Sequence, residues 1–459
     1  MKHLSISIVF ALFLIGCKSN SQPPSPTSIL LTDVNIVDVA KGLVLEKKQV
    51  VIDSGLIVSI SDQIAHPEDY GNKIDGAGKF LMPGLAEMHA HIPSPNTSRE
   101  RLEETLFLYL SNGITTIRGM LGHPMHQELR KEVSDGEVLG PRIFTSSPSL
   151  NGNSVETTEE ARSKVTAYAE AGYDFLKIHP GIRKNVFDTL VATANEKSIA
   201  YAGHVPVDVG IRHALESGYA SIDHIDGYLE GLVPTEKGLD PNTNGFFGYD
   251  FTDETDPANI DDLVSLTKEK QVWIVPTQSL FERWFAPTSA EDMLAQPEMQ
   301  YMPASTLDQW KRRKLQSTGP DSGFDSEKWE RFIQIRRQLL KSLHDQGHGI
   351  ILGSDAPQLF NVPGFSIHHE MEGMLRAGLT PLEILRTGTI NPATYFEMES
   401  TFGQVKEGLE ADLILLEGNP IEDLKHMKKV SGVMVRGHWI SKEEIDQRLR
   451  SIAKNAQNN

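Results

Sequence analysis

Two histidines separated by one residue, His89 and His91, follow an apolar run in the stretch LAEMHAHIPSP, residues 85–95. Successive side chains of a strand point to opposite faces, so both imidazoles would lie on the same face. Neutral imidazole is a common ligand of zinc and related metals. The alternative is two polar residues where a buried strand meets a loop. The pair alone leaves both interpretations open.

Four further ligand-type residues stand at or near the ends of other short apolar segments: Lys177 in FLKIHP, His204 in AGHV, His224 in IDHI and Asp355 in GSDAP. Imidazole and carboxylate groups suit Zn²⁺ and its neighbours in the first transition row. Without a metal, such groups buried together would carry a high desolvation cost. Their joint placement on strand ends by chance is improbable, so the four histidines and Asp355 predict a metal site.

The segments that position these residues alternate strand-like and helix-like stretches. Eight candidate strands lie between residues 81 and 400: FLMPGLAEMH, GITTIRGM, PRIFTSS, YDFLKIH, IAYAGHV, ASIDHI, QVWIVPT and GIILGSDA. Helix-like stretches such as 156–171 and 183–198 separate them. Eight such units are typical of a (β/α)₈ barrel, in which the carboxyl ends of the strands converge on the active site.

The two ends of the chain show strand patterning instead. Residues 29–63 alternate apolar and polar positions, and similar patterns return at 411–420 and 430–440. Because chain termini often lie close together, these flanks are predicted to pair into one small sheet domain, residues 29–80 with 401–445.

Two long intervals between strands are expected to lie near the barrel mouth. The interval 281–345 is charged and contains three tryptophans. It is interpreted as helices with a lid, or alternatively as plain helical packing on the barrel exterior. The interval 229–260 holds acidic residues, glycines and aromatics, and we expect it to overhang the site.

The first residues, MKHLSISIVFALFLIGC, combine a basic start, a short apolar run and the only cysteine of the chain, Cys17. The run is too short to span a bilayer comfortably and fits a signal-peptide core. The last four of these residues resemble a bacterial lipobox, which implies removal of residues 1–16 and lipidation of Cys17. An ordinary secretory signal with an incidental cysteine is the alternative. Residues 17–28 are predicted to be a flexible tether, so we expect membrane anchoring in the bacterial cell envelope.

Composition limits the remaining classes. The chain has 459 residues, of which 39% are hydrophobic and 23% charged, enough for a substantial core. The formal net charge of −18 argues against nucleic acid as a partner, because an acidic surface repels phosphate backbones. The oligomeric state stays open, with a homo-oligomer among the alternatives.

The ordered set of His89, His91, Lys177, His204, His224 and Asp355 resembles the amidohydrolase superfamily. The segment FLMPGLAEMHAH is similar to that superfamily's entry into its first barrel strand. The segments EMEGMLRAGLTPLEILRTGTINPA, GQVKEGLEADLILLEGNP and VSGVMVRGHWI resemble the closing part of its imidazolonepropionase-like and Xaa-Pro dipeptidase-like branch. The resemblance covers most of the mature chain. It implies a (β/α)₈ TIM barrel with a small β-sandwich domain formed by the N- and C-terminal segments.

The same resemblance implies a metal-dependent hydrolase that cleaves an amide-type C–N bond in a small molecule, with Xaa-Pro dipeptides as one substrate class. A lactone, ester or cyclic-amide hydrolase is one alternative, and a non-catalytic ligand-binding lipoprotein is another. Mononuclear deaminases tend to carry a glutamate shortly after the strand-five histidine. Here His204 is followed by VPVDVG, which disfavours a deaminase.

Lys177 decides between one metal and two. An ordinary lysine has a pKa of about 10.4, and its ammonium cannot bind a cation. In binuclear superfamily members this lysine carries CO₂ as a carbamate that bridges the metals, which implies two Zn²⁺ or similar ions here. His89, His91 and Asp355 would hold one ion, and His204 and His224 the other. A structural lysine paired with Asp355 or a neighbouring carboxylate is the alternative.

Roles around the metals follow as hypotheses. Asp355 would take a proton from the nucleophilic water and pass it to the leaving amine. Tyr228 would donate to the oxyanion or to a substrate carboxylate, unless it is a packed loop aromatic. His179 shares a strand face with Lys177 and is predicted to touch substrate. Arg118 would bind a carboxylate, unless a salt bridge occupies it. Four other histidines are taken as structural: His123, His126, His368 and His369.

Overall fold

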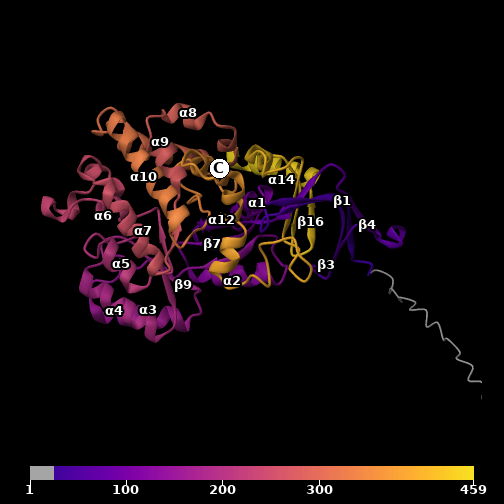
Figure 1. Ribbon diagram of the computed structural model, residues 1–459, viewed down its shortest axis with the longest axis horizontal. Coiled ribbons are helices and arrows are strands. Elements are labelled where there is room, and N and C mark those ends of the chain that lie inside the picture. Colours follow the sequence, from indigo (N-terminus) through magenta and orange to yellow (C-terminus); the bar gives the residue numbers. More distant parts are fainter. Residues whose placement is uncertain (1–24, 459) are drawn as a thin grey trace, which may run out of the picture.

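The computed structural model describes residues 25–458. The predicted signal peptide, Cys17 and most of the tether therefore lie outside the described residues. Within the described part, no helix is both long enough and apolar enough to cross a membrane. The chain folds into a β-rich end, which contains both flanking segments, and a larger part in which strands and helices alternate (Figure 1).

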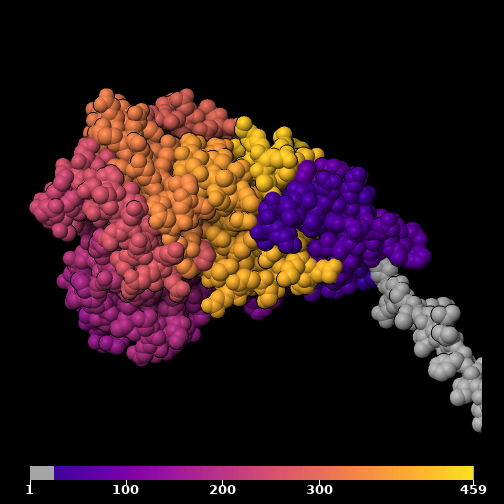
Figure 2. Space-filling view, in the orientation of Figure 1, coloured from indigo at the N-terminus to yellow at the C-terminus, as the bar shows by residue number. Residues whose placement is uncertain are grey.

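Strands from both flanks share one mixed sheet, in the order β16-β15-β14-β5-β1-β2-β3, with β4 paired to β1. Their bounds are β1 Ile29–Asp38, β2 Leu43–Asp53, β3 Leu56–Ser61, β4 Asn72–Asp75, β5 Phe80–Pro83, β14 Leu413–Leu416, β15 Val430–Val435 and β16 His438–Ser441. The flanks meet where β5 pairs antiparallel with β14. Leu31 of β1, Leu81 of β5 and Leu415 of β14 are buried together in one hydrophobic cluster. Figure 2 shows the two ends of the sequence in contact on this part of the surface.

Each of the eight predicted middle segments contains a parallel strand. The bounds are β6 Leu85–Ala90, β7 Ile114–Gly119, β8 Arg142–Thr145, β9 Phe175–Ile178, β10 Ala200–Gly203, β11 Ser221–Asp223, β12 Trp273–Val275 and β13 Gly349–Ile350. They form two sheets, β6-β7-β8 and β9-β10-β11-β12-β13. The fold of this part is therefore α/β, with neighbouring strands following one another along the chain.

Short bridges join the edges of these two sheets. Ser146 pairs with Phe175 next to β8 and β9, and Ala90 of β6 pairs with Ala356, just beyond β13. Both bridges are parallel. The backbone N–H of His91 also donates to the Ala356 carbonyl at 2.7 Å. The sheet that carries the two histidines is thus tied to the segment that carries Asp355.

Helices cover the strands. Their bounds are α1 Arg99–Ser111, α2 Pro124–Ser134, α3 Thr158–Glu170, α4 Lys184–Glu196, α5 Ile211–Ser217, α6 Tyr228–Gly231, α7 Ile260–Glu269, α8 Ala290–Leu294, α9 Ala304–Thr318, α10 Ser326–Gln346, α11 Ser366–Arg376, α12 Pro381–Thr387, α13 Ile390–Tyr395 and α14 Lys442–Asn458. Local sequence starts several of them: Thr157 with Glu160, and Thr380 with Glu383, form capping boxes. Leu190, Leu263 and Leu339 pack into the same core as the strand residues.

The C-terminal helix α14 extends beyond the predicted sheet segment, which ended at residue 445. Its apolar residues Ile445, Ile452 and Ala456 are buried. Their spacing of seven and four residues places them on one helix face. The Arg448 guanidinium lies over the Phe107 ring of α1, 4.8 Å from its centroid, so the helix is held against the α/β part.

Candidate metal centre

His89, His91 and Asp355 meet in one buried cluster. The Asp355 Oδ1 atom lies 2.7 Å from His91 Nε2 and 3.3 Å from His89 Nε2. His89 lies near the end of β6 and His91 directly follows the strand, and their ring centroids are 5.4 Å apart. Asp355 arrives from the segment after β13, which pairs with β6. The structure therefore brings the three predicted residues together.

The other two predicted histidines continue this cluster. His224, which follows β11, has its ring centroid 4.7 Å from that of His89 and 4.6 Å from that of His204. His204 follows β10 and is partly exposed. The sequence prediction that these strand ends converge thus holds for all four imidazoles and for Asp355.

Hydrogen bonds to neighbouring side chains fix the orientation of the His224 and His204 rings. The Nδ1 atom of His224 lies 2.8 Å from the Thr277 hydroxyl, and that of His204 lies 3.0 Å from Asp226 Oδ2. A hydrogen bond at one ring nitrogen leaves the other available, and metal-bound histidines are usually held in this way. The arrangement leaves the Nε2 atoms of His204 and His224 free to bind a cation.

Two acidic residues of the cluster escaped the sequence prediction. Asp223 Oδ2 lies 3.3 Å from His89 Nδ1. Strand alternation would turn Asp223 away from His224, but His224 has a left-handed backbone with φ of 65°, which breaks the alternation. The second residue, Glu87, accepts hydrogen bonds from the backbone N–H of His89 and of Ser354, and so ties β6 to the Asp355 segment.

The electrostatics favour the protonation states that bind a metal. Burial lowers the pKa of His89 to about 4 and that of His224 well below its usual range. Burial would raise the pKa of Asp355, but the imidazoles of His89 and His91 hold it below its usual value. For Asp223, Lys177 likewise outweighs burial and lowers the pKa. The imidazoles of His89 and His224 are thus neutral at neutral pH, beside the ionised carboxylates of Asp223 and Asp355.

The donor atoms fit a cation. Ligand atoms of His89, His91 and Asp355 all lie within 4.8 Å of one another, and so do those of His89, Asp223 and His224. The buried Nδ1 atom of His89 lies 3.3 Å from Asp223 Oδ2 but makes no hydrogen bond of good geometry, so it can still serve as a donor to a cation. Two overlapping sets of nitrogen and carboxylate donors are the kind that bind Zn²⁺ and related ions.

Lys177 lies in the same cluster but is already paired. Its Nζ atom donates to Asp223 Oδ2 at 3.0 Å, and both side chains are fully buried. This is the pairing expected of an unmodified lysine, with Asp223 rather than Asp355 as the carboxylate.

Comparison with known proteins agrees with this geometry. The model of the family described as "Amidohydrolase family" matches residues 80–440. The chain belongs to the amidohydrolase family. This amidohydrolase is 22% identical to ochratoxinase from Aspergillus niger in an alignment 459 positions long, which covers 85% of this chain and 81% of that protein.

Solved structures share the fold of this amidohydrolase. Bottromycin amidohydrolase has a TM-score of 0.70 and 21% identity, and the match covers 94% of this chain and 91% of that one. A Xaa-Pro dipeptidase with bound methionine has a TM-score of 0.62 and 19% identity, with 90% of this chain and 100% of that one covered. At such identities the similarity concerns the fold.

For Arg118 the structure shows the salt-bridge alternative, and the predicted contact with substrate stays untested. Its guanidinium is fully buried and donates to Asp223 at 3.1 Å, to the Ser221 hydroxyl and to the Met88 carbonyl. The side chain points into the core between the strands of the amidohydrolase, which is the salt-bridge alternative. Its role is to support Asp223 from below.

Replacing Arg118 by methionine should lower the free energy of unfolding by about 3–5 kcal/mol, because Asp223 would lose a buried partner. Urea unfolding measures this. The control Arg212→Met removes an exposed pair with Asp262 and should cost about 0–1 kcal/mol. Unchanged stability together with a raised KM would instead restore the substrate-binding role.

For Tyr228 the structure likewise shows the alternative, a packed aromatic side chain. Tyr228 is fully buried at the start of α6, and its hydroxyl bonds the Thr267 hydroxyl of α7 at 2.6 Å. The structure thus places its hydroxyl between two helices, bonded to Thr267.

His179 does join the site. Its ring stacks on that of His204, with centroids 5.0 Å apart, and its Nδ1 atom lies 2.8 Å from the Ser149 hydroxyl. Burial lowers the pKa of His179, so the ring is neutral. The predicted contact with substrate stays a prediction, and the half-buried position is compatible with it.

The interval 229–260 reaches the site through η4 (Phe246–Glu254), where Phe247 contacts the rings of His204 and His224. The interval 281–345 contributes mainly α9 and α10. Arg336 of α10 is buried and donates to the His224 carbonyl at 2.9 Å. The second interval thus contacts the site through α10, and its Phe281 packs against Phe247.

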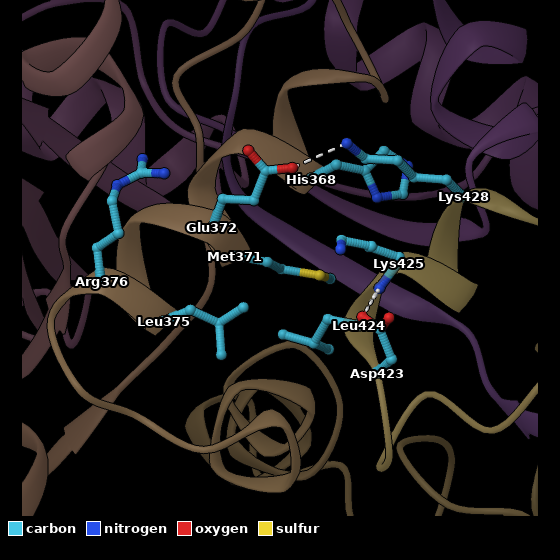
Figure 3. Close-up of a pocket in the computed structure, with 9 residues that line it drawn as sticks. All are labelled: His368, Met371, Glu372, Leu375, Arg376, Asp423, Leu424, Lys425 and Lys428. Atoms are coloured by element: carbon cyan, nitrogen blue, oxygen red, sulfur yellow. Dashed lines mark hydrogen bonds and ion pairs between the residues drawn. The ribbon is translucent and has the colours of Figure 1, made fainter.

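A separate cavity of about 260 Å³ lies between α11 and η8 (Leu424–Lys428), as Figure 3 shows. None of the predicted site residues lines it. His368 lies at its wall and is held by Asn112, with Nε2 and Oδ1 3.0 Å apart. The charged Lys428 pairs with Glu372 at 2.8 Å. This cavity is therefore distinct from the metal centre.

Proposed function

We propose that the chain is a metal-dependent hydrolase that cleaves an amide-type C–N bond in a small molecule. One observation carries this proposal: four imidazoles and two carboxylates converge in one buried cluster at the ends of parallel strands. Family membership supports it, because amidohydrolases are hydrolases. A ligand-binding lipoprotein would not need so complete a donor set.

The proposal includes a closed (β/α)₈ barrel. The bridges Ser146–Phe175 and Ala90–Ala356 support closure, because they link the edges of the two parallel sheets in strand order. A closed barrel would place all the strand ends around one mouth. The mixed sheet built by the two flanks supports a separate small β-sandwich domain.

Zn²⁺ is the proposed metal, with two ions per chain. His89, His91 and Asp355 would hold the first, and His204 with His224 the second, with carboxylated Lys177 between them. Lys177 would lose a proton and form a bond from Nζ to the carbon of CO₂. Asp223 would then keep its contact with Arg118, which already binds its other carboxylate oxygen.

The metal would supply Lewis acidity and a lowered water pKa, of about 7. The protein contributes the proton transfers. The Asp355 carboxylate is ionised, so it can accept the proton of the attacking water. It then donates this proton to the leaving nitrogen, which otherwise would depart as an unstable amide anion. Thr277 and Asp226 keep two imidazoles oriented throughout.

Substrate class is testable with one panel. Xaa-Pro dipeptides, other N-acyl amino acids and lactones are assayed with Zn²⁺ or Mn²⁺ and bicarbonate. The name of the similar Xaa-Pro dipeptidase supports the first class. We expect amine release from at least one C–N substrate. Hydrolysis of lactones alone would replace the proposal by the alternative of an ester-type hydrolase.

The location in the cell is proposed from the sequence. The lipobox-like stretch before Cys17 supports a lipid-anchored protein of the bacterial cell envelope, reached by small substrates. A homo-oligomer remains compatible with this proposal. Metabolic labelling with a fatty acid, lost in Cys17→Ser, would test the anchor.

A further inference from the structure

An apolar ring borders the candidate metal centre. The Phe247 ring centroid lies 5.3 Å from that of His224 and 5.7 Å from that of His204. Among ring contacts within residues 25–458, these are the ones that join an apolar side chain to a predicted ligand. The Phe247 side chain is only half-buried, so part of it remains available to a bound molecule.

A cluster of aromatic side chains holds the Phe247 ring in position. Its neighbour Phe246 packs against Trp284 and Phe285, with centroid distances of 5.1 and 4.7 Å. Phe247 itself meets Phe281 edge-on at 5.2 Å. Rings arranged at such distances attract one another beyond simple burial. The turn that carries Phe246 and Phe247 is therefore held by packing against these aromatic side chains.

The backbone at this ring is strained. Phe247 has φ of 51° and ψ of 45°, a left-handed conformation that costs roughly 1–2 kcal/mol for an ordinary residue. Glycine or asparagine would adopt it more easily. Gly248 is also left-handed, and a Cβ there would lie 2.7 Å from Leu229 Cδ2. Strain of this kind persists where the surroundings enforce it, and such positions cluster at functional sites.

We propose that Phe247 is a specificity-determining residue that selects substrates with a flat apolar group beside the scissile carbonyl. This inference rests on the proposed function. A carbonyl held near His204 and His224 would bring its substituent against the ring. Arg118 and Tyr228 are fully buried and hydrogen-bonded to Asp223 and Thr267, respectively. The contact available there is thus aromatic and apolar, with His179 as its polar neighbour.

The test compares two substrates that differ only in the acyl group, a benzoyl and an acetyl derivative of one amino acid. Phe247→Asn removes the ring and tolerates the left-handed backbone, so the fold should persist. Phe247→Tyr keeps the ring. Phe324→Leu is the matched control, because Phe324 packs on Tyr249 and Phe285 in the same aromatic group but does not touch a histidine.

The expected result is a fall in kcat/KM of about tenfold for the benzoyl substrate in Phe247→Asn, with less than about a twofold change for the acetyl substrate. Phe247→Tyr and Phe324→Leu should keep the wild-type ratio. An equal fall for both substrates, or an unchanged ratio, would overturn the inference while leaving the hydrolase intact.

If the wild-type protein hydrolyses neither substrate, the hydrolase proposal fails for N-acyl amino acids. The role of Phe247 is then tested separately, by measuring the binding of benzoate and acetate by calorimetry. The wild-type protein should bind benzoate more tightly than acetate, and Phe247→Asn should remove this preference. Equal binding of the two carboxylates by the wild-type protein would overturn the inference.

Discussion

The Asp355→Asn variant is expected to lose about 10³-fold in kcat while it stays folded. Asparagine has nearly the same shape, but its amide cannot accept the proton of the attacking water or return it to the leaving nitrogen. Removal of a general acid–base group typically costs 10²- to 10⁴-fold. Steady-state kinetics, metal content and thermal unfolding of the same preparation measure the effect. Asp188→Asn, which changes an exposed carboxylate on α4, is the control.

The geometry explains why the effect should be large. Asp355 has a left-handed backbone with φ of 65°, and the backbone N–H that it carries is bonded to the His89 carbonyl at 2.9 Å. Its carboxylate is thus held against His89 and His91 by the main chain as well as by charge. Near-full turnover in Asp355→Asn, with metal still bound, would remove Asp355 from the proton transfer.

The Lys177→Gln variant is expected to bind one metal equivalent fewer than the wild type and to lose at least about 10²-fold in kcat. The glutamine amide can still donate to Asp223, so the buried acid keeps a partner. However, an amide cannot react with CO₂. Metal analysis of purified protein and kinetics with added bicarbonate test this. Lys184→Gln, at an exposed lysine of α4, is the control.

The opposite outcome is informative as well. If Lys177→Gln keeps the wild-type metal content and turnover, Lys177 is a structural partner of Asp223. The two side chains form an ion pair at 3.0 Å. The enzyme would then work with a single metal held by His89, His91 and Asp355. Lower stability alone, without a change in metal content, would lead to the same conclusion.

The strand ends were predictable because a short apolar run followed by a ligand-type residue is a local pattern. His89, His91 and His204 needed no knowledge of packing, since each stands where its strand meets a loop. Asp355 was found in the same way. The eight strands and the pairing of β6 with the Asp355 segment then followed from their order along the chain.

The positions of Asp223, Arg118 and Tyr228 depend on tertiary contacts that a local sequence pattern does not contain. Asp223 faces the site because the left-handed backbone of His224 ends the alternation. Arg118 looked functional as a charge at a strand end, but its partners come from β6, β11 and the residue Tyr395, far away in sequence. Tyr228 stands four residues beyond a ligand, and a turn into α6 directs it to α7. Only three-dimensional packing decides such cases.

The central claim is that this cluster binds a metal on which hydrolysis depends. Its most direct test is a titration of chelator-treated protein with Zn²⁺ in the presence of bicarbonate, in which bound metal and amine release are measured in the same samples. We predict no amine release without metal, and activity that rises with bound metal until the sites are filled. Tight binding of less than one equivalent, or full amine release from the metal-depleted protein, would contradict the claim.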